Sequence, residues 1–279
     1  MDTLQTQYPV MPLKNTVLFP QQVIPIYVGR KKSLQLIDDL DPDNKYLVVV
    51  AQQDGSVEDP REEDLYSYGT LALVLKTFDM PDNSKSAIVQ GVDRVKILKY
   101  QEGDTYFMAD VERIPESITS PDVQVEALAK SLKSSFTELI KISPNLNEEH
   151  AGMLSNIDRP SRLADRATSL LSVSNSEKQE VLEELDIKKR VENAINLLQK
   201  EIQRIKLGEE IQTEVQDEIS KTQREYYLRE QMKTIQKELG EDNQTVELDE
   251  LTKKIDDVKM SEEATKVAHK ELDRLERIS

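Results

Sequence analysis

Short apolar runs alternate with turn residues over the first part of the chain, from Tyr8 to Ile114. This spacing is typical of short β-strands joined by tight turns, and Pro25 within one run indicates a strand at a sheet edge. The predicted strands span residues 17–19, 24–28, 46–52, 70–78, 86–90, 94–100 and 106–113, and residues 32–40 form the one predicted helix among them. Many short strands with little helix predict a small barrel or sandwich.

The second part of the chain has helical periodicity. All eleven prolines lie at or before Pro160, and only two of the eight glycines lie beyond it. After a polar hinge at residues 115–121, apolar residues recur at steps of three and four from Val125 to Leu139. That spacing places them on one buried helix face. The sequence therefore predicts turn-rich β structure first and helices afterwards.

One of these helices is expected to be very long. From Val191 to Ile205 the apolar steps alternate between four and three, which is coiled-coil spacing. Residues 187–239 contain no proline, so a single helix of about 80 Å is possible at about 1.5 Å per residue. The polar stretch at residues 220–225 has too little apolar surface for a core. Two shorter amphipathic helices are predicted at residues 248–258 and 262–278.

These patterns predict an α+β chain with four segments. Residues 1–117 form a β-rich domain, 118–185 a helical bundle, 186–240 the long coiled-coil-like helix and 241–279 short helices. We expect the β domain to fold independently, because the hinge that follows it has little apolar content to tie it down.

Tyr226 and Tyr227 are the candidate binding residues, together with Met232. Adjacent helical residues point about 100° apart, so one apolar stripe cannot bury both tyrosines. Either one ring packs and the other lies along the surface, or at least one contacts another chain, a role for which aromatic residues are favoured. Met232 is flexible and polarizable and extends the same surface. We expect these three residues to contact substrate or a neighbouring subunit.

Composition excludes several classes of function. The net charge of −16 argues against a nucleic-acid surface, which needs a basic face. There is no cysteine, the apolar runs are too short for a membrane span and no secretory signal opens the chain, so a cytoplasmic protein is expected. The three basic residues Arg30, Lys31 and Lys32 are interpreted as a solvated helix start.

No catalytic, metal or cofactor site is predicted. The glycines are never closer than twelve residues, so neither common phosphate-binding loop can be written with them. His150 and His269 lack partners at metal-ligand spacing. Acidic clusters and Ser–Lys pairs are present without a supporting context, so we expect no ATPase or peptidase activity from this chain.

Three motifs resemble Lon-type ATP-dependent proteases. They are QREYYLREQMKTIQKELG at residues 223–240, PLKNTVLFPQQVIPIYVGRKKS at 12–33, and the segment from Tyr68 through GTLALV to VQGVDRVKIL, which ends at Leu98. They follow the family's order and cover almost the whole chain. Asn83 stands where the family commonly has glycine, but asparagine tolerates a left-handed backbone.

The resemblance implies a barrel-like β domain and a role in substrate recognition and assembly. The parent protein would be an AAA+ serine protease that forms a homohexamer, uses ATP and Mg, and degrades misfolded and regulatory proteins. Its ATPase and Ser–Lys peptidase parts would lie outside this chain, whose partners would be unfolded or tagged polypeptides. The alternative is a stand-alone peptide-binding adaptor or scaffold with a coiled-coil dimerisation helix, which the residues alone slightly favour.

Overall fold

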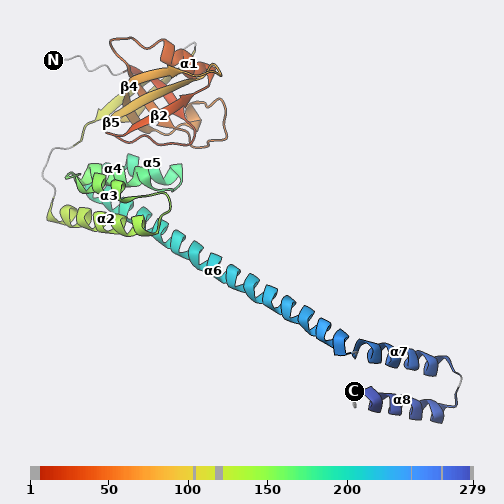
Figure 1. The fold of residues 1–279 in the computed structure, drawn as a ribbon. Helices are drawn as coiled ribbons and strands as arrows, with labels where there is room; N and C mark the ends of the chain where they lie inside the picture. Colours follow the sequence, from red (N-terminus) through yellow and green to blue (C-terminus); the bar gives the residue numbers. More distant parts are fainter. Residues whose placement is uncertain (1–6, 103–104, 117–121, 240, 259, 277–279) are drawn as a thin grey trace. The chain divides into compact units, whose positions relative to one another are not determined.

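The computed structural model describes residues 7–102, 105–116, 122–239, 241–258 and 260–276, which form the α+β fold in Figure 1. The strands are β1 (Gln7–Leu13), β2 (Val23–Val28), β3 (Tyr46–Ala51), β4 (Tyr68–Asp79), β5 (Lys85–Glu102) and β6 (Phe107–Ile114). The helices are α1 (Lys31–Asp38), α2 (Val123–Ile142), α3 (Glu148–Ser155), α4 (Pro160–Leu170), α5 (Asn175–Glu183), α6 (Ile187–Leu239), α7 (Glu241–Asp257) and α8 (Glu262–Glu276), with a short 3₁₀ turn at Glu62–Asp64.

The six strands form one sheet in the order β2-β5-β4-β3-β1-β6, and a further pairing joins β5 to β6. This last pairing closes a ring of five strands, with β2 attached outside the ring to β5. β1 and β3 are parallel and all other pairs are antiparallel. Pro25 lies in β2, which pairs with β5 only, so the predicted sheet edge is confirmed.

Two strand predictions are wrong for one local reason. The predicted turn at residues 91–93 lies inside the continuous strand β5, where the register against β4 shifts between Leu71 and Ala72. The backbone of Gly91 exchanges hydrogen bonds with Gln21 and Gln22. A Cβ at Gly91 would lie 2.3 Å from the Phe19 carbonyl oxygen. Glycine at position 91 therefore permits the close approach of another backbone segment at a β-bulge. That segment is the loop that contains residues 17–19, which were predicted to form a strand.

The helices α2 to α5 and the first turns of α6 form a bundle, as the predicted periodicity requires (Figure 1). The predicted stripes of α2 and α6 are buried in one cluster with α4 and α5. Its largest members include Leu132, Phe136, Leu139, Leu154, Leu163, Leu182 and Leu198. The long helix is confirmed as α6, and Gly208 lies within it without ending it.

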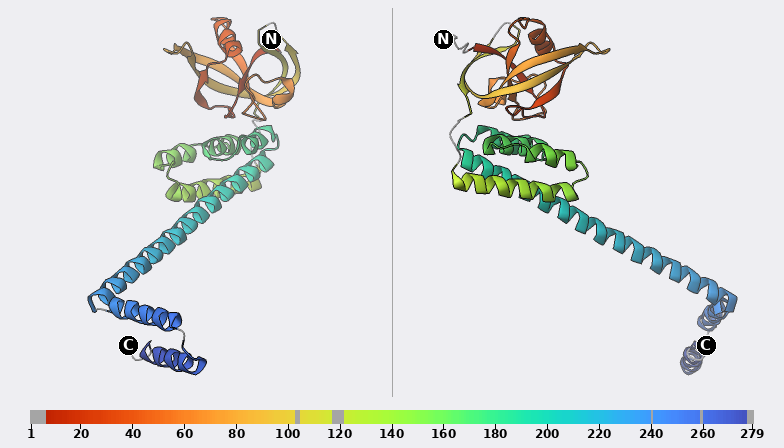
Figure 2. Two further views of the ribbon diagram at one scale, coloured as in Figure 1. Left: turned by 90° about the vertical axis from the view of Figure 1, so that its right-hand side faces the viewer. Right: turned by 60° about the vertical axis from the view of Figure 1, so that its left-hand side comes forward.

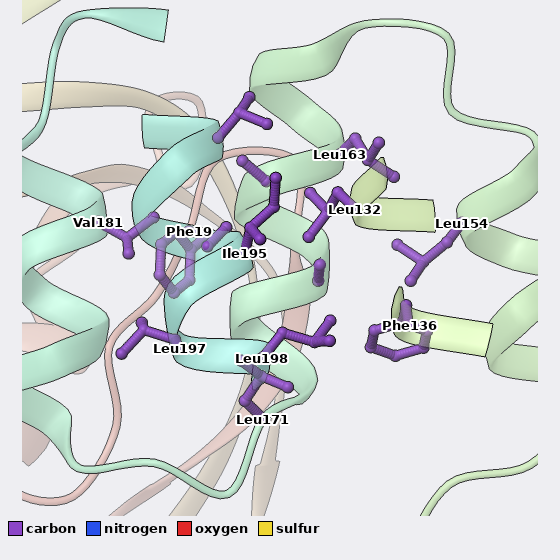
Figure 3. Close-up of a cluster of buried hydrophobic side chains, with 14 of the residues drawn as sticks. Phe19, Leu132, Phe136, Leu154, Leu163, Leu171, Val181, Ile195, Leu197 and Leu198 are labelled. Carbon is purple, nitrogen blue, oxygen red and sulfur yellow. The ribbon is translucent and has the colours of Figure 1, made fainter. Parts of the chain in front are cut away.

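The β domain shares this helical core. Val17, Phe19 and Ala51, which precede or end strands of the sheet, belong to the cluster of the bundle. Figure 3 shows the Phe19 ring beside Val181 and Ile195. By compactness the chain divides into residues 1–207 and residues 208–279, and the four predicted segments stay a prediction. The shared core argues against an independently folding β domain.

A buried ion pair crosses from the sheet to the bundle. The guanidinium of Arg94 in β5 donates to the Asp165 carboxylate in α4 and, through Nε, to the Leu182 carbonyl at 2.9 Å. Both side chains of the pair are nearly inaccessible to solvent. Burial, followed by the like charge of Arg94, lowers the pKa of Arg190 to about 10, so this second buried arginine stays protonated at neutral pH. Its Nε donates to the Glu184 carbonyl at 2.7 Å.

The second unit contains the end of α6 and the two short helices (Figure 2). α7 and α8 pack against each other, and His269 Nε2 lies 3.2 Å from a carboxylate oxygen of Asp256. Glycine commonly caps the C-terminus of a helix, so the sequence predicts a cap at Gly240. This residue lies outside the described residues. None of the helices in the described part of the chain combines the length and apolar character that a bilayer crossing needs.

Replacing Phe19 by alanine is expected to destabilise the sheet and the bundle together. The ring is buried in the bundle's core, and truncation of a buried phenylalanine costs about 3–5 kcal/mol. Denaturant unfolding, followed by tyrosine fluorescence and by helical circular dichroism, should show coincident transitions that shift equally. Leu98→Ala, at an exposed position, is the control. A variant whose helical signal keeps its original midpoint would contradict the shared core.

Glu116→Gln should lower stability at neutral pH but much less in acid. Burial alone raises the pKa of Glu116, but hydrogen bonds from Ser161 and Arg162 outweigh it, and the net pKa is lowered. A lowered pKa contributes stability above the usual value of about 4.3, and this contribution is lost as pH falls through the folded-state pKa. We expect about 1–2 kcal/mol at neutral pH. The thermal midpoints of the unaltered chain and of Glu116→Gln, measured from neutral pH down to below the usual glutamate pKa, test this prediction. A difference between the two midpoints that stays constant at all pH values would disprove the stabilising role of the ionised Glu116.

Candidate functional site

The structure places all three candidate binding residues on the surface of α6. Tyr226 is 67% exposed, Tyr227 is 62% exposed and Met232 is also exposed. The only hydrogen bond to these rings among the described residues runs from Gln231 Nε2 to the Tyr227 hydroxyl, at 2.9 Å. The interpretation that one tyrosine packs within the chain is therefore wrong. Both rings are available to another chain.

Apolar side chains lie on two different faces of α6. Ile211, Val215 and Ile219 are about half exposed and follow each other at steps of four. Leu228 and Met232 begin a second exposed stripe. Nine residues separate Ile219 from Leu228, which at about 100° per residue places them on opposite sides of the helix. The exposed apolar surface therefore turns around the helix axis along α6.

A second exposed apolar surface lies on the sheet and was not predicted from the sequence. Phe78 of β4 lies opposite Ser86 of β5, which in turn lies opposite Tyr27 of β2. Residues directly opposite in neighbouring strands share a face. Both Phe78 and Tyr27 are exposed, as is Met80 in the turn that follows β4. We call Tyr27, Phe78 and Met80 the sheet patch.

Polar contacts hold the sheet patch in place. The Tyr27 hydroxyl donates to Asp82 Oδ2 at 3.0 Å, and Lys76 Nζ lies 4.7 Å from the centre of the Phe78 ring. Asn83 adopts φ of 62°, the left-handed conformation expected at this position. The missed signal is the sequence VIPIYV of β2, which has apolar residues on both faces of an edge strand. A strand with one solvent-facing side normally alternates with polar residues.

The described residues do not assemble a metal site. No three histidine, cysteine, aspartate or glutamate side chains among them lie close enough to hold a metal ion. His150 caps its own helix, since its backbone nitrogen donates to Asn147 Oδ1 at 3.3 Å and its ring Nδ1 accepts from the Asn147 backbone. What the geometry provides is apolar surface for binding, on α6 and on the sheet.

Comparison with known proteins accounts for this arrangement. A family model described as the ATP-dependent protease La (LON) substrate-binding domain matches residues 7–200. The chain belongs to this family. It is 42% identical to a Lon protease of Koribacter versatilis over 97% of its own length and 33% of the relative's. It is 39% identical to the Lon protease of Dictyoglomus thermophilum over 96% of its length and 34% of the relative's.

The chain therefore spans about a third of the length of these relatives. The fold also matches two solved structures. The N-terminal domain of a Mycobacterium avium complex Lon protease has a TM-score of 0.57 at 22% identity, over 69% of this chain and 98% of that one. A Lon N-terminal domain protein from Xanthomonas campestris has a TM-score of 0.51 at 19% identity, over 68% and 98%. The substrate-binding assignment agrees with the exposed apolar surface.

Replacing both Tyr226 and Tyr227 by alanine should leave the structure of the chain intact. Neither ring fills a core, and alanine is a stronger helix former than tyrosine. Helical circular dichroism and the thermal midpoint should stay nearly unchanged, while binding to an unfolded polypeptide or self-association weakens. The matched control is Lys221→Ala with Thr222→Ala, another adjacent exposed pair on α6. A double tyrosine variant that loses many degrees of thermal stability and binds normally would identify the tyrosines as structural.

Proposed function

We propose that this chain recognises substrates and supports assembly for an ATP-dependent serine protease of the Lon type. In this proposal, ATP with Mg and the Ser–Lys peptidase act in other parts of the parent protein. The parent would be a cytoplasmic homohexamer that degrades misfolded and regulatory proteins. The relatives, which are about three times as long as the matched segment, support this division of labour.

The sheet patch is the observation that carries the recognition role. Unfolded polypeptides expose apolar side chains that native proteins bury, and contiguous exposed apolar surface is typical of interaction sites. Aromatic residues suit such a site because they bind by area and stacking rather than by sequence-specific hydrogen bonds. Tyr27 and Phe78 provide two rings on one face of the sheet. The chain's net charge of −16 disfavours nucleic acid as the partner.

The two apolar faces of α6 support the assembly role. A helix that exposes Ile211 and Val215 on one side and Leu228 and Met232 on another gains stability by burying them against other chains. Because the exposed apolar residues turn around the helix axis along α6, they can contact more than one partner chain. We propose that Tyr226, Tyr227 and Met232 contact substrate or a neighbouring subunit.

The recognition role predicts that Tyr27→Ser with Phe78→Ser weakens binding of a labelled, unfolded casein by about tenfold. Loss of two aromatic anchors removes at least about 1.4 kcal/mol of binding free energy. Fluorescence anisotropy measures the affinity, and circular dichroism verifies the fold. Leu98→Ser, which changes an exposed apolar residue of β5 outside the patch, should bind as the unaltered chain does. Equal affinities for all three proteins would refute the patch as the binding surface.

A further inference from the structure

A groove runs between β1, β2 and the start of α1. It consists of two hollows of about 650 and 340 Å³ that share Pro12, Arg30, Ser33 and Glu58. The larger hollow is lined by the end of β1 and by β2, over the buried side chains of Met11 and Ile26. The smaller one adds Val10, Pro60, Tyr106 and Phe107 to its lining. We call the two hollows together the α1 groove; its lining is apolar along its length and polar at the shared seam.

One wall of the α1 groove is a strand edge without a strand partner. β1 pairs with β6 only from Gln7 to Pro9, and with β3 from Val10 to Leu13. The Leu13 carbonyl accepts from the Gln52 nitrogen on the β3 side. Because successive carbonyls of a strand point to opposite edges, the Pro12 carbonyl points to the other side. Within the described residues no strand covers that side, and an extended chain can pair there.

The seam of the groove is the N-terminus of α1. The first helical hydrogen bond of α1 runs from the Leu34 nitrogen to the Arg30 carbonyl, so the amides of residues 31–33 precede it. Arg30 at the N-cap makes no side-chain capping bond. Ser33 lines both hollows and is only 7% exposed, and its hydroxyl has no hydrogen-bond partner among the described residues. The hydroxyl is therefore able to bind a ligand that enters the groove.

The charges at the seam favour an anion. Four cationic side chains line the two hollows against two carboxylates, which leaves this spot positive in a chain of net charge −16. Lys14 and Lys32 already pair with Glu58 and Asp59. The Arg30 guanidinium instead donates only to neutral oxygens, at 2.6 Å to Gln52 Oε1 and 3.4 Å to the Val57 carbonyl. Burial lowers the pKa of Arg30, and the nearby charges of Glu58 and Asp59 partly offset this effect. Neither carboxylate is hydrogen-bonded to the guanidinium among the described residues, so its N–H groups can turn to a ligand.

We propose that the α1 groove binds the C-terminal segment of an extended polypeptide. The terminal carboxylate lies at Arg30, the Ser33 hydroxyl and the free amides of α1. The preceding residues run along the open edge of β1 with apolar side chains over Val10, Pro12 and Phe107. Capture of a carboxylate by free amides beside an open strand edge is a known mode of peptide recognition. This inference rests on the proposed function, since it assigns one class of substrate end to the same domain.

The groove fits this occupant better than other anions. A nucleic acid needs an extended basic face, and the rest of the chain is acidic. A small inorganic anion leaves the apolar hollows on both sides of the seam unfilled. A polypeptide terminus supplies the anion, the main-chain donors for the Pro12 carbonyl and the apolar side chains together.

The test uses a short labelled peptide ending in Val-Thr-Ile-Val, in three forms. One has a free carboxylate, one a C-terminal amide, and one a C-terminal amide with aspartate in place of the threonine. Fluorescence anisotropy with the full chain should give about tenfold tighter binding of the free acid than of either amide, the effect of losing charge-assisted bonds. Arg30→Gln should remove this preference, and Ser33→Ala should reduce it severalfold. Lys99→Gln, at an exposed site elsewhere on β5, should leave it unchanged.

Several outcomes would overturn the inference. Equal affinity for the free-acid peptide and the amidated peptide excludes capture of a carboxylate. If the amidated peptide with the internal aspartate binds as tightly as the free acid, the groove does not require a C-terminal carboxylate. If both Arg30→Gln and Ser33→Ala keep the preference for the free acid, the α1 groove is not the binding site. Ser33→Ala introduces a residue that favours helix, so this variant keeps the test valid if Arg30→Gln unfolds. If the acid preference is absent while unfolded casein still binds through the sheet patch, only the groove assignment fails. If neither ligand binds, the proposed function fails as well.

Discussion

The ion pair between Arg94 and Asp165 constrains how the sheet and the helical bundle fit together. Two charges are buried at a junction that also contains the apolar cluster of the bundle, and removing one partner of such a pair typically costs about 3–5 kcal/mol. The Leu182 carbonyl fixes the same guanidinium from a third element. These three groups come from β5, α4 and α5. We infer that the ion pair favours this arrangement of the three elements, together with the burial of Phe19.

This arrangement explains which surfaces of the described residues remain for binding. One part of the sheet packs against the bundle. Among the described residues, β2 is paired on one side, and β1 lacks a strand partner on its β6 side beyond Pro9. The sheet face with Tyr27 and Phe78 is exposed. α6 enters the bundle core with its first turns only, and its later apolar residues have no core to fill. The chain is therefore organised to present apolar surface, which suits a domain that binds polypeptides of many sequences.

Local patterns in the sequence predicted the helices and the class of fold. The steps from Val191 to Ile205 and the absence of proline were sufficient for α6, because helical periodicity depends on near neighbours. Contacts between distant segments were not predictable in this way. Gly91 resembled a turn residue, yet its function is to admit the backbone of Phe19. Arg30 was interpreted as solvated, and the surface formed by Tyr27 with Phe78 depends on strand register, which no local pattern specifies.

The central claim is that residues 7–114 of this chain bind polypeptides through the surfaces described. Amide hydrogen exchange of the full chain, with and without an unfolded polypeptide, tests it most directly, because exchange reports local protection. The account predicts slower exchange in β1, β2, the first turn of α1 and the β4–β5 turn when polypeptide is bound, with little change in the buried helices α4 and α5. Protection confined to α2–α5, or none in residues 7–114 under conditions where the polypeptide is bound, would contradict it.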